Sequence, residues 1–139
     1  MEDCKRKYSL DARLQQGVDL GERMFCAFEH ALNQYKYAVL IGCDCPGMTV
    51  SDLNDAYSKL ESGHNAVLGP AEDGGYFLIG LRQNSRRLFT GIEWGGADVS
   101  SVTRSKMIGL SWRWCELSTR WDVDLPADLV RLQDEMEYN

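Results

Sequence analysis

The sequence has 139 residues, of which 44% are hydrophobic and 26% are charged, a balance typical of one soluble globular domain. Its net charge of −6 disfavours long-range attraction to DNA, RNA or anionic lipid, so we expect no nucleic-acid partner and no membrane partner. No apolar run is long enough to span a bilayer, and residues 1–10 lack the apolar core of a signal peptide, which predicts a cytoplasmic protein.

The five cysteines follow no framework spacing, so free thiols are the simplest interpretation. Cys43 and Cys45 form a close pair, but no second cysteine pair completes the four ligands that a structural zinc site needs. We therefore predict no zinc site.

Strands and helices are predicted to alternate along the chain. Residues 8–15 alternate apolar and polar side chains, as a strand does, although their helix propensity is not poor. Residues 19–35 predict an amphipathic helix that begins at a D-x-x-E capping box formed by Asp19 and Glu22. Residues 37–43 are too uniformly apolar for a strand with one wet face, and they predict a buried strand.

The alternation continues to the end of the chain. Thr49 and Asp52 repeat the capping pattern at the start of a helix that Gly63 ends. The further elements are strands at 65–70 and 75–81, a helical turn at 85–89, a helix at 98–110 capped by Asp98, a strand at 111–117, and a helix at 126–136 with Pro126 in its first turn. This order predicts an α/β fold with three layers, in which helices cover both faces of a mixed, mostly parallel sheet.

Asp44 is the first candidate functional residue, because it follows the apolar residues 38–43. A charge at the edge of a core is costly unless it is paired or binds a cation. In α/β sheets ligands gather at the carboxyl ends of strands, which is where we expect Asp44. The alternative is that Asp44 only caps a turn before Pro46.

Several stretches together resemble one protein family: residues 16–24 (QGVDLGERM), 39–49 (VLIGCDCPGMT), 67–81 (VLGPAEDGGYFLIGL), 88–99 (LFTGIEWGGADV) and 122–132 (DVDLPADLVRL). They are similar to the bacterial glycosyltransferase-A-like proteins of unknown function. These belong to the nucleotide-diphospho-sugar transferase superfamily, near the guanylyltransferases that make molybdopterin and deazaflavin cofactors. The resemblance covers residues 16–132, and GPAEDGGYFLIGL is its most specific element.

The resemblance implies that the chain binds a nucleotide or nucleotide sugar together with Mg²⁺ or Mn²⁺. Asp44 matches the aspartate that holds the metal on the phosphates. Asp124 matches a second acidic position of the metal site, and Asp122 is a lesser candidate. Carboxylates and phosphates supply the hard oxygen ligands that both ions prefer. Asp124 could instead only cap the last helix, because Leu125 replaces the threonine that is usual in relatives.

The EDGG turn is the second candidate region, and by the resemblance it faces the acceptor or sugar side of the cleft. Gly74 and Gly75 would let backbone N–H groups approach a substrate closely. Glu72 or Asp73 could contact a substrate hydroxyl or accept a proton, so Asp73 joins Asp44 as a candidate catalytic residue. A hairpin connection is the alternative, since D-G is a common turn dipeptide.

Trp94 is a candidate substrate-binding residue on the same side of the cleft. We predict that it packs beneath the site, with stacking on a sugar or base as the alternative.

Relatives of this type begin with a strand and a glycine-rich loop whose lysine and arginine grip the triphosphate, and nothing of that kind precedes residue 16. The resemblance therefore predicts a single domain, residues 1–139, without that N-terminal strand and loop. Two functions stay open. One is a metal-dependent nucleotidyl- or glycosyltransferase, and the other is a catalytically degenerate remnant that acts as an oligomeric binding module.

The missing loop predicts weak nucleotide binding. A parallel sheet without its first strands has an unpaired edge, so we also expect a homodimer that repairs this edge. Residues 7–15 are the segment we place there, either from a second copy or folded back within one chain.

Overall fold

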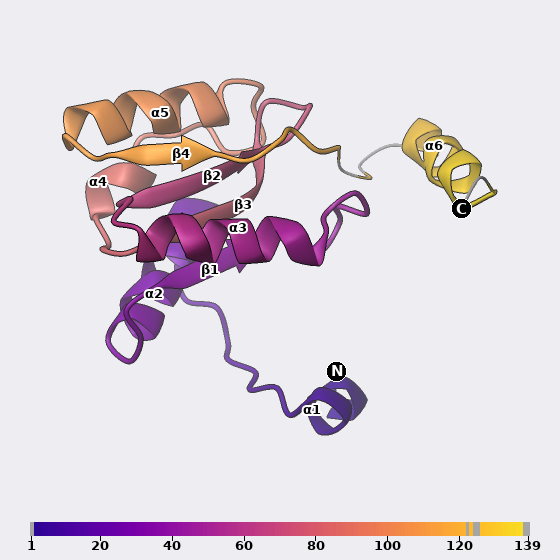
Figure 1. The fold of residues 1–139 in the computed structure, drawn as a ribbon, viewed down its shortest axis with the longest axis horizontal. Coiled ribbons are helices and arrows are strands. Elements are labelled where there is room, and N and C mark those ends of the chain that lie inside the picture. Colours follow the sequence, from indigo (N-terminus) through magenta and orange to yellow (C-terminus); the bar gives the residue numbers. More distant parts are fainter. Residues whose placement is uncertain (1, 122, 124–125, 138–139) are drawn as a thin grey trace.

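The structure is a computed structural model that describes residues 2–121, 123 and 126–137 (Figure 1). Its elements follow in chain order: α1 (Glu2–Tyr8), α2 (Leu20–Leu32), β1 (Ala38–Ile41), α3 (Val50–Glu61), β2 (Ala66–Pro70), β3 (Tyr76–Leu81), α4 (Arg86–Phe89), α5 (Val99–Gly109), β4 (Trp114–Glu116) and α6 (Pro126–Glu137). None of these helices is long and apolar enough to cross a lipid bilayer.

Four strands form one mixed sheet in the order β1-β3-β2-β4. β3 lies between β1 and β2 and is antiparallel to both, whereas β2 and β4 are parallel. Three strands therefore run in one direction and β3 opposes them. The α/β class and the mixed sheet are as predicted, and residues 71–75 form the hairpin connection between β2 and β3 that the sequence left open.

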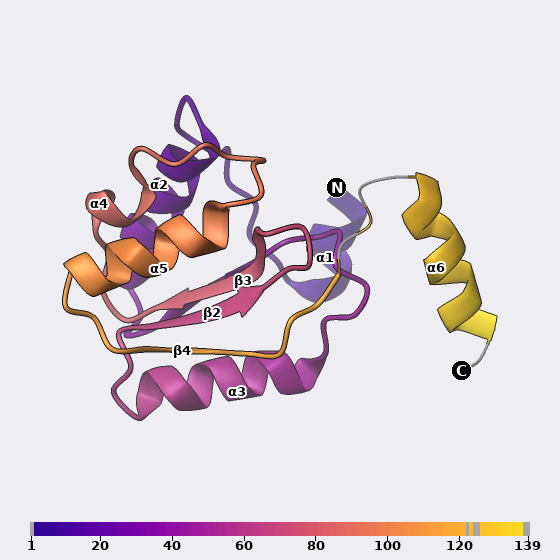
Figure 2. The same ribbon diagram turned by 90° about the horizontal axis from the view of Figure 1, so that it is seen from above.

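Helices cover both faces of this sheet, as Figure 2 shows. On one face Phe28 of α2, Phe89 of α4 and Met107 of α5 belong to one buried core cluster. On the other face Ala56 and Leu60 of α3 belong to a second buried cluster. Burial of apolar surface on both faces is the dominant stabilising force, and it produces the predicted three layers.

Residues 8–15 do not form the strand that their alternation predicts. Residues 2–8 are helix α1, and the segment from 10 to 16 is irregular. Leu10 is 56% exposed and Leu14 is 91% exposed. A segment with alternating apolar side chains forms a strand only where a neighbouring strand completes its backbone hydrogen bonds. No described strand pairs with this segment.

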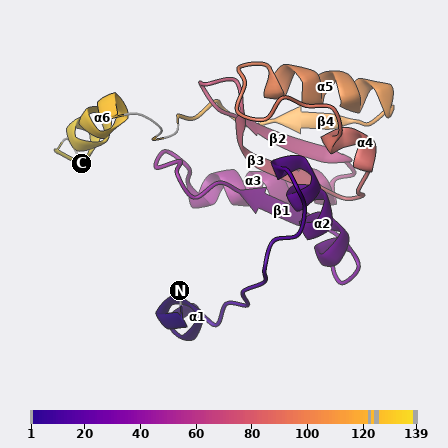
Figure 3. The same cartoon turned by 180° about the vertical axis from the view of Figure 1, so that it is seen from behind.

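We call residues 2–17 the N-terminal arm. It is interrupted at Ser9 and ends at Gly17, and both residues have a positive φ. Figures 1 and 3 show that the arm leaves α2 on the side of the sheet that β1 borders and ends at α1, away from the sheet.

Two of the three predicted helix caps are present. Asp19 Oδ1 accepts a hydrogen bond from the Glu22 N–H at 2.8 Å, and Thr49 and Asp52 form a reciprocal capping box at the start of α3. The predicted cap at Asp98 is wrong, because its side chain accepts no capping hydrogen bond. The ψ of Asp98 is 6°, far from the extended backbone that lets a capping side chain reach forward.

One ion pair ties the start of α3 to the end of the sheet. Arg120 Nη2 lies 3.0 Å from Asp52 Oδ1, and the Asp52 side chain is only 7% exposed. The Arg120 N–H donates to the Pro70 carbonyl at 3.0 Å, and the Arg120 carbonyl accepts from the Glu72 N–H at 2.8 Å. Burial disfavours the charged form of Asp52, but hydrogen bonds from Arg120 and Thr49 outweigh it and lower its pKa.

Replacing Asp52 with Asn should therefore destabilise the fold by about 1.5–3 kcal/mol at pH 7, because a charged hydrogen-bond acceptor is lost from a largely buried position. The folded-state pKa of Asp52 lies below its ordinary value of 3.8. Its contribution is thus fully present above that pH and is lost as the pH falls through the folded pKa. Urea unfolding at a series of pH values measures the difference.

The matched control is Asp55→Asn, which changes an exposed aspartate of the same helix and should alter stability by less than about 0.5 kcal/mol. Two outcomes would contradict the assigned role of Asp52. One is equal stability of the two variants at pH 7. The other is a difference in the free energy of unfolding between wild type and Asp52→Asn that increases as the pH falls.

Candidate functional site

Four of the predicted site residues line one cavity of about 340 Å³. Asp44 follows β1, Asp73 and Gly75 belong to the β2–β3 turn, and Trp94 comes from the loop between α4 and α5. Three segments that are far apart in the sequence therefore meet at the end of the sheet where β1 and β2 finish. This is the edge at which α/β sheets place their ligands.

Five further residues line the cavity without having been predicted: Leu20, Tyr76, Gly95, Gly96 and Val99. Leu20 is the first residue of α2, and it lies in the QGVDLGERM stretch that supports the family resemblance. The two glycines directly follow Trp94. These five residues lie in the sequence stretches that support the family resemblance, and this was the signal that could have identified them. Their spacing in the sequence gives no indication of a role.

The β2–β3 turn is fixed to the start of α5. Within the turn the Ala71 N–H donates to the Gly75 carbonyl at 3.0 Å, and the Gly74 N–H donates to the Ala71 carbonyl at 3.1 Å. Ser100 of α5 donates its N–H to the Gly74 carbonyl at 2.8 Å, and its hydroxyl donates to the Gly75 carbonyl. Gly74 has a φ of +91°, and a Cβ there would lie 1.8 Å from the Ala97 carbonyl oxygen.

Asp73 is held in a defined orientation. Its Oδ1 accepts a hydrogen bond from the Gly75 N–H at 2.8 Å, the arrangement of an Asx turn. Oδ2 has no hydrogen-bond partner among the described residues. One carboxylate oxygen is thus used to shape the turn and the other is available to a ligand.

Asp44 is exposed, and its backbone is tied to a distant segment. The Val123 N–H donates to the Asp44 carbonyl at 2.9 Å. The neighbours of Val123 in the sequence are Asp122 and Asp124. These two predicted metal ligands lie outside the described residues.

Two predicted residues of the EDGG turn do not line the cavity. The Glu72 carboxylate accepts a hydrogen bond from Arg131 Nη1 of α6 at 2.9 Å, and this hydrogen bond lowers the pKa of Glu72. Gly74 packs against Ala97 instead. The Glu72 side chain thus links the turn to α6, Gly74 lies against the loop before α5, and Asp73 supplies its carboxylate to the cavity.

Trp94 both borders the cavity and packs against the core cluster of the α2 face. Its ring meets Tyr76 edge to face, with ring centroids 6.5 Å apart and an interplanar angle of 90°. Trp94 Nε1 is buried and has no hydrogen-bond partner among the described residues. Burial raises the pKa of Tyr76 well above its ordinary value, although a hydrogen bond with Thr103 opposes the shift, so this phenol stays neutral.

The charged groups that line the cavity among the described residues are two carboxylates, those of Asp44 and Asp73. No lysine or arginine among the described residues lines it. The described part of the chain also contains no group of three His, Cys, Asp or Glu side chains placed to hold a metal ion. Val99 starts α5, so the positive end of this helix dipole borders the cavity and favours an anion there.

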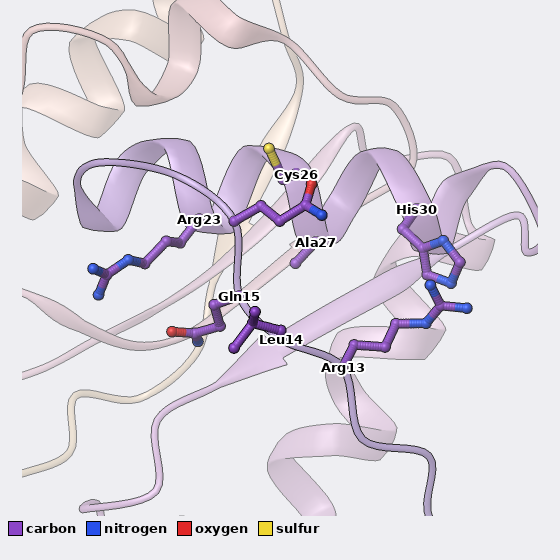
Figure 4. Close-up of a pocket in the computed structure, with 8 residues that line it drawn as sticks. Arg13, Leu14, Gln15, Arg23, Cys26, Ala27 and His30 are labelled. Carbon is purple, nitrogen blue, oxygen red and sulfur yellow. The ribbon is translucent and has the colours of Figure 1, made fainter.

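A larger cavity of about 440 Å³ lies between residues 13–16 of the N-terminal arm and one face of α2. Figure 4 shows Arg13 and His30 toward one end of it and Arg23 toward the other. None of the predicted site residues lines this cavity. We therefore assign the candidate site to the smaller cavity, where the predicted residues converge.

Comparison with known proteins identifies similar chains. A solved structure from Desulfovibrio desulfuricans G20, described as a "putative nucleotide-diphospho-sugar transferase", is 41% identical, with a TM-score of 0.75. The match covers 79% of this chain and 48% of that one, so this chain spans about half the length of the structure it matches. Residues 1–96 match the model of a family described as an uncharacterized protein conserved in bacteria. No curated protein matches the sequence.

The close approach of Gly74 to Ala97 yields a test. Gly74→Ala should destabilise the protein by about 3 kcal/mol or more, because the turn must move away from the loop before α5. Gly91→Ala is the matched control: its φ is +69° but a Cβ would meet nothing within 4 Å, so only the left-handed strain of about 1–2 kcal/mol applies. Thermal unfolding measures both, and similar losses would show that the Gly74 contact is not formed in solution.

Proposed function

Since this chain belongs to the DUF2064 family, whose model matches residues 1–96, we propose that it binds a nucleotide or nucleotide sugar together with a divalent metal ion. The observation that carries the proposal is the convergence of Asp44, Asp73 and Trp94 on one cavity at the end of the sheet. The 41% identity to the solved structure supports the same class of ligand.

Asp44 is the proposed anchor of the metal, with Asp124 as its second ligand and Asp122 as the lesser candidate. The hydrogen bond from the Val123 N–H to the Asp44 carbonyl supports this pairing, because it brings the backbone between the two other aspartates to Asp44. Carboxylate oxygens suit Mg²⁺ or Mn²⁺, whose other positions would be filled by phosphate and water. When bound, the ion would neutralise phosphate charge and stabilise a departing pyrophosphate or nucleoside diphosphate.

Asp73 and the turn around it are the proposed acceptor side. Asp73 Oδ2 could accept a hydrogen bond or a proton from a substrate hydroxyl, while the Gly75 N–H holds Oδ1 in place. Trp94 would form an apolar wall against a sugar or base. The start of α5, which borders the same cavity, would favour phosphate there.

The absence of a described lysine or arginine from the cavity wall favours weak binding. Proteins usually bind phosphate through cationic side chains or several backbone N–H donors. Without the metal, two carboxylates and one helix end would therefore bind a triphosphate weakly. The same observation supports a second candidate function, a catalytically degenerate remnant that acts as a binding module. Metal-dependent turnover of a nucleotide sugar or nucleoside triphosphate would favour the enzyme over the module.

Metal binding is the first test. Titration of Mn²⁺, followed by calorimetry or paramagnetic broadening, should show binding to the wild type that Asp44→Asn and Asp124→Asn each weaken about tenfold or more. Asp55→Asn, on the exposed side of α3, should bind as the wild type does. If the Asp44 and Asp124 variants also retain wild-type affinity, the proposed metal site is wrong.

Nucleotide binding is the second test, in a thermal-shift panel of GTP, CTP, UTP and UDP-glucose with and without Mn²⁺. A ligand present at its dissociation constant stabilises a protein by about 0.4 kcal/mol, which raises Tm by about 1–3 °C for a domain of this size. We expect shifts of that order at millimolar ligand, and only with Mn²⁺. Saturation at micromolar nucleotide would contradict the predicted weak binding, and no shift with any ligand would contradict the proposed ligand class.

A further inference from the structure

The outer edge of β1 is one of the two open edges of the described sheet. β1 pairs with β3 on one side and has no described strand on the other. The Gly42 N–H donates to the Phe77 carbonyl at 2.9 Å, which extends the antiparallel register of β1 and β3 by one pair. Because hydrogen-bonded and non-hydrogen-bonded pairs alternate in such a ladder, Leu40 also bonds to β3, while Val39 and Ile41 direct their N–H and C=O groups outward.

Little protects this edge. Exposed edges usually carry a charged side chain, a proline or a bulge that prevents pairing with another chain. The four residues of β1 are Ala, Val, Leu and Ile, paired in regular register with β3. The Ile41 side chain is 48% exposed at the end of the strand. The edge therefore offers both unpaired backbone groups and apolar surface.

The N-terminal arm has the complementary properties. Tyr8, Leu10 and Leu14 follow a period of two and are 60%, 56% and 91% exposed. No residue of the arm belongs to either core cluster. The cavity of about 440 Å³ between residues 13–16 and α2 shows that the arm is not packed onto its own α2 (Figure 4). The arm contains no proline, so each of its residues can contribute an N–H to a strand ladder.

The base of the arm directs it away from the edge of its own sheet. The Val18 N–H donates to Glu22 Oε2 at 3.0 Å, and Arg23 Nε donates to the Gly17 carbonyl at 3.3 Å. A Cβ at Gly17 would lie 2.6 Å from the Glu22 Cβ, so the chain lies tightly against α2 at this point. Figures 1 and 3 show the arm continuing outward from there.

We propose that the partner of this edge is a second copy of the chain: residues 9–15 of each copy add as a strand to the β1 edge of the other. The exchange is reciprocal and closes as a two-fold dimer, in which the β1 edge of each copy is paired. The arm carries four basic and three acidic residues, in a chain whose net charge is −6, so it approaches a predominantly acidic partner. This inference does not depend on the proposed nucleotide site.

Light scattering coupled to size exclusion tests the proposal over about 1–100 μM protein. We expect twice the mass of one chain for the wild type, and the mass of one chain for two variants. The first lacks residues 2–14, and the second is Ile41→Lys, which places a charge on the edge. Val50→Lys is the matched control, because Val50 is 73% exposed and belongs to α3 rather than to β1. This variant should stay dimeric. A monomeric wild type at 100 μM, or a dimer that persists without the arm, overturns the proposal.

Mixing the two monomeric variants separates strand exchange from direct β1–β1 pairing. The Ile41→Lys chain still has an arm, and the arm-deleted chain still has an intact edge. Strand exchange therefore predicts that a tagged arm-deleted chain retains the Ile41→Lys chain, whereas neither variant retains itself. Failure of the mixture to associate, with both variants showing a wild-type circular-dichroism spectrum, overturns the proposal as well.

Discussion

The Asp52–Arg120 pair is the contact on which the functional end of the molecule depends. Arg120 reaches the amino end of α3 through its side chain, while its backbone bonds to the end of β2 and to the β2–β3 turn. Helix, strand and turn are therefore fixed to one another by a single residue. Because the Asp52 side chain is largely buried, loss of either partner would leave the other charge or its donors unsatisfied, which costs far more than loss of a surface pair.

The sequence predicted this region in part. Thr49 and Asp52 are three residues apart, and a capping box needs only local spacing, so that half of the arrangement was predictable. The same spacing gave no sign that Asp52 also binds Arg120, 68 residues later. The strands and helices from residue 19 onward were predictable for a similar reason, because each carries a local signal: an apolar period, an uninterrupted apolar run or a capping residue. The position of β3 between β1 and β2 was not, since sheet order is set by contacts that no local pattern records.

The wrong prediction at residues 8–15 and the convergence of four predicted residues on the cavity have a common explanation. Alternation at Tyr8, Leu10 and Leu14 forms a strand only if another strand supplies the missing hydrogen bonds, and no described strand of the same chain does so there. Asp44 and the EDGG turn, by contrast, lie at the ends of strands that the chain does pair. Their meeting at one cavity follows from sheet topology, whereas Leu20 and Val99 reach it through helix starts that sequence spacing does not locate in space.

The hairpin at the centre of the sheet also has a kinetic consequence. β2 and β3 are joined by the short turn at residues 71–75, so their pairing closes a small loop. β1 and β4 pair with the same hairpin across about 40 to 50 residues of sequence. Contacts of short sequence separation form first when loop closure limits folding, so the hairpin is the expected nucleus to which the outer strands add. Asp73 and Gly75 thus belong to the folding nucleus and to the cavity at once. Selection for binding at this turn would therefore be constrained by the rate at which the chain folds.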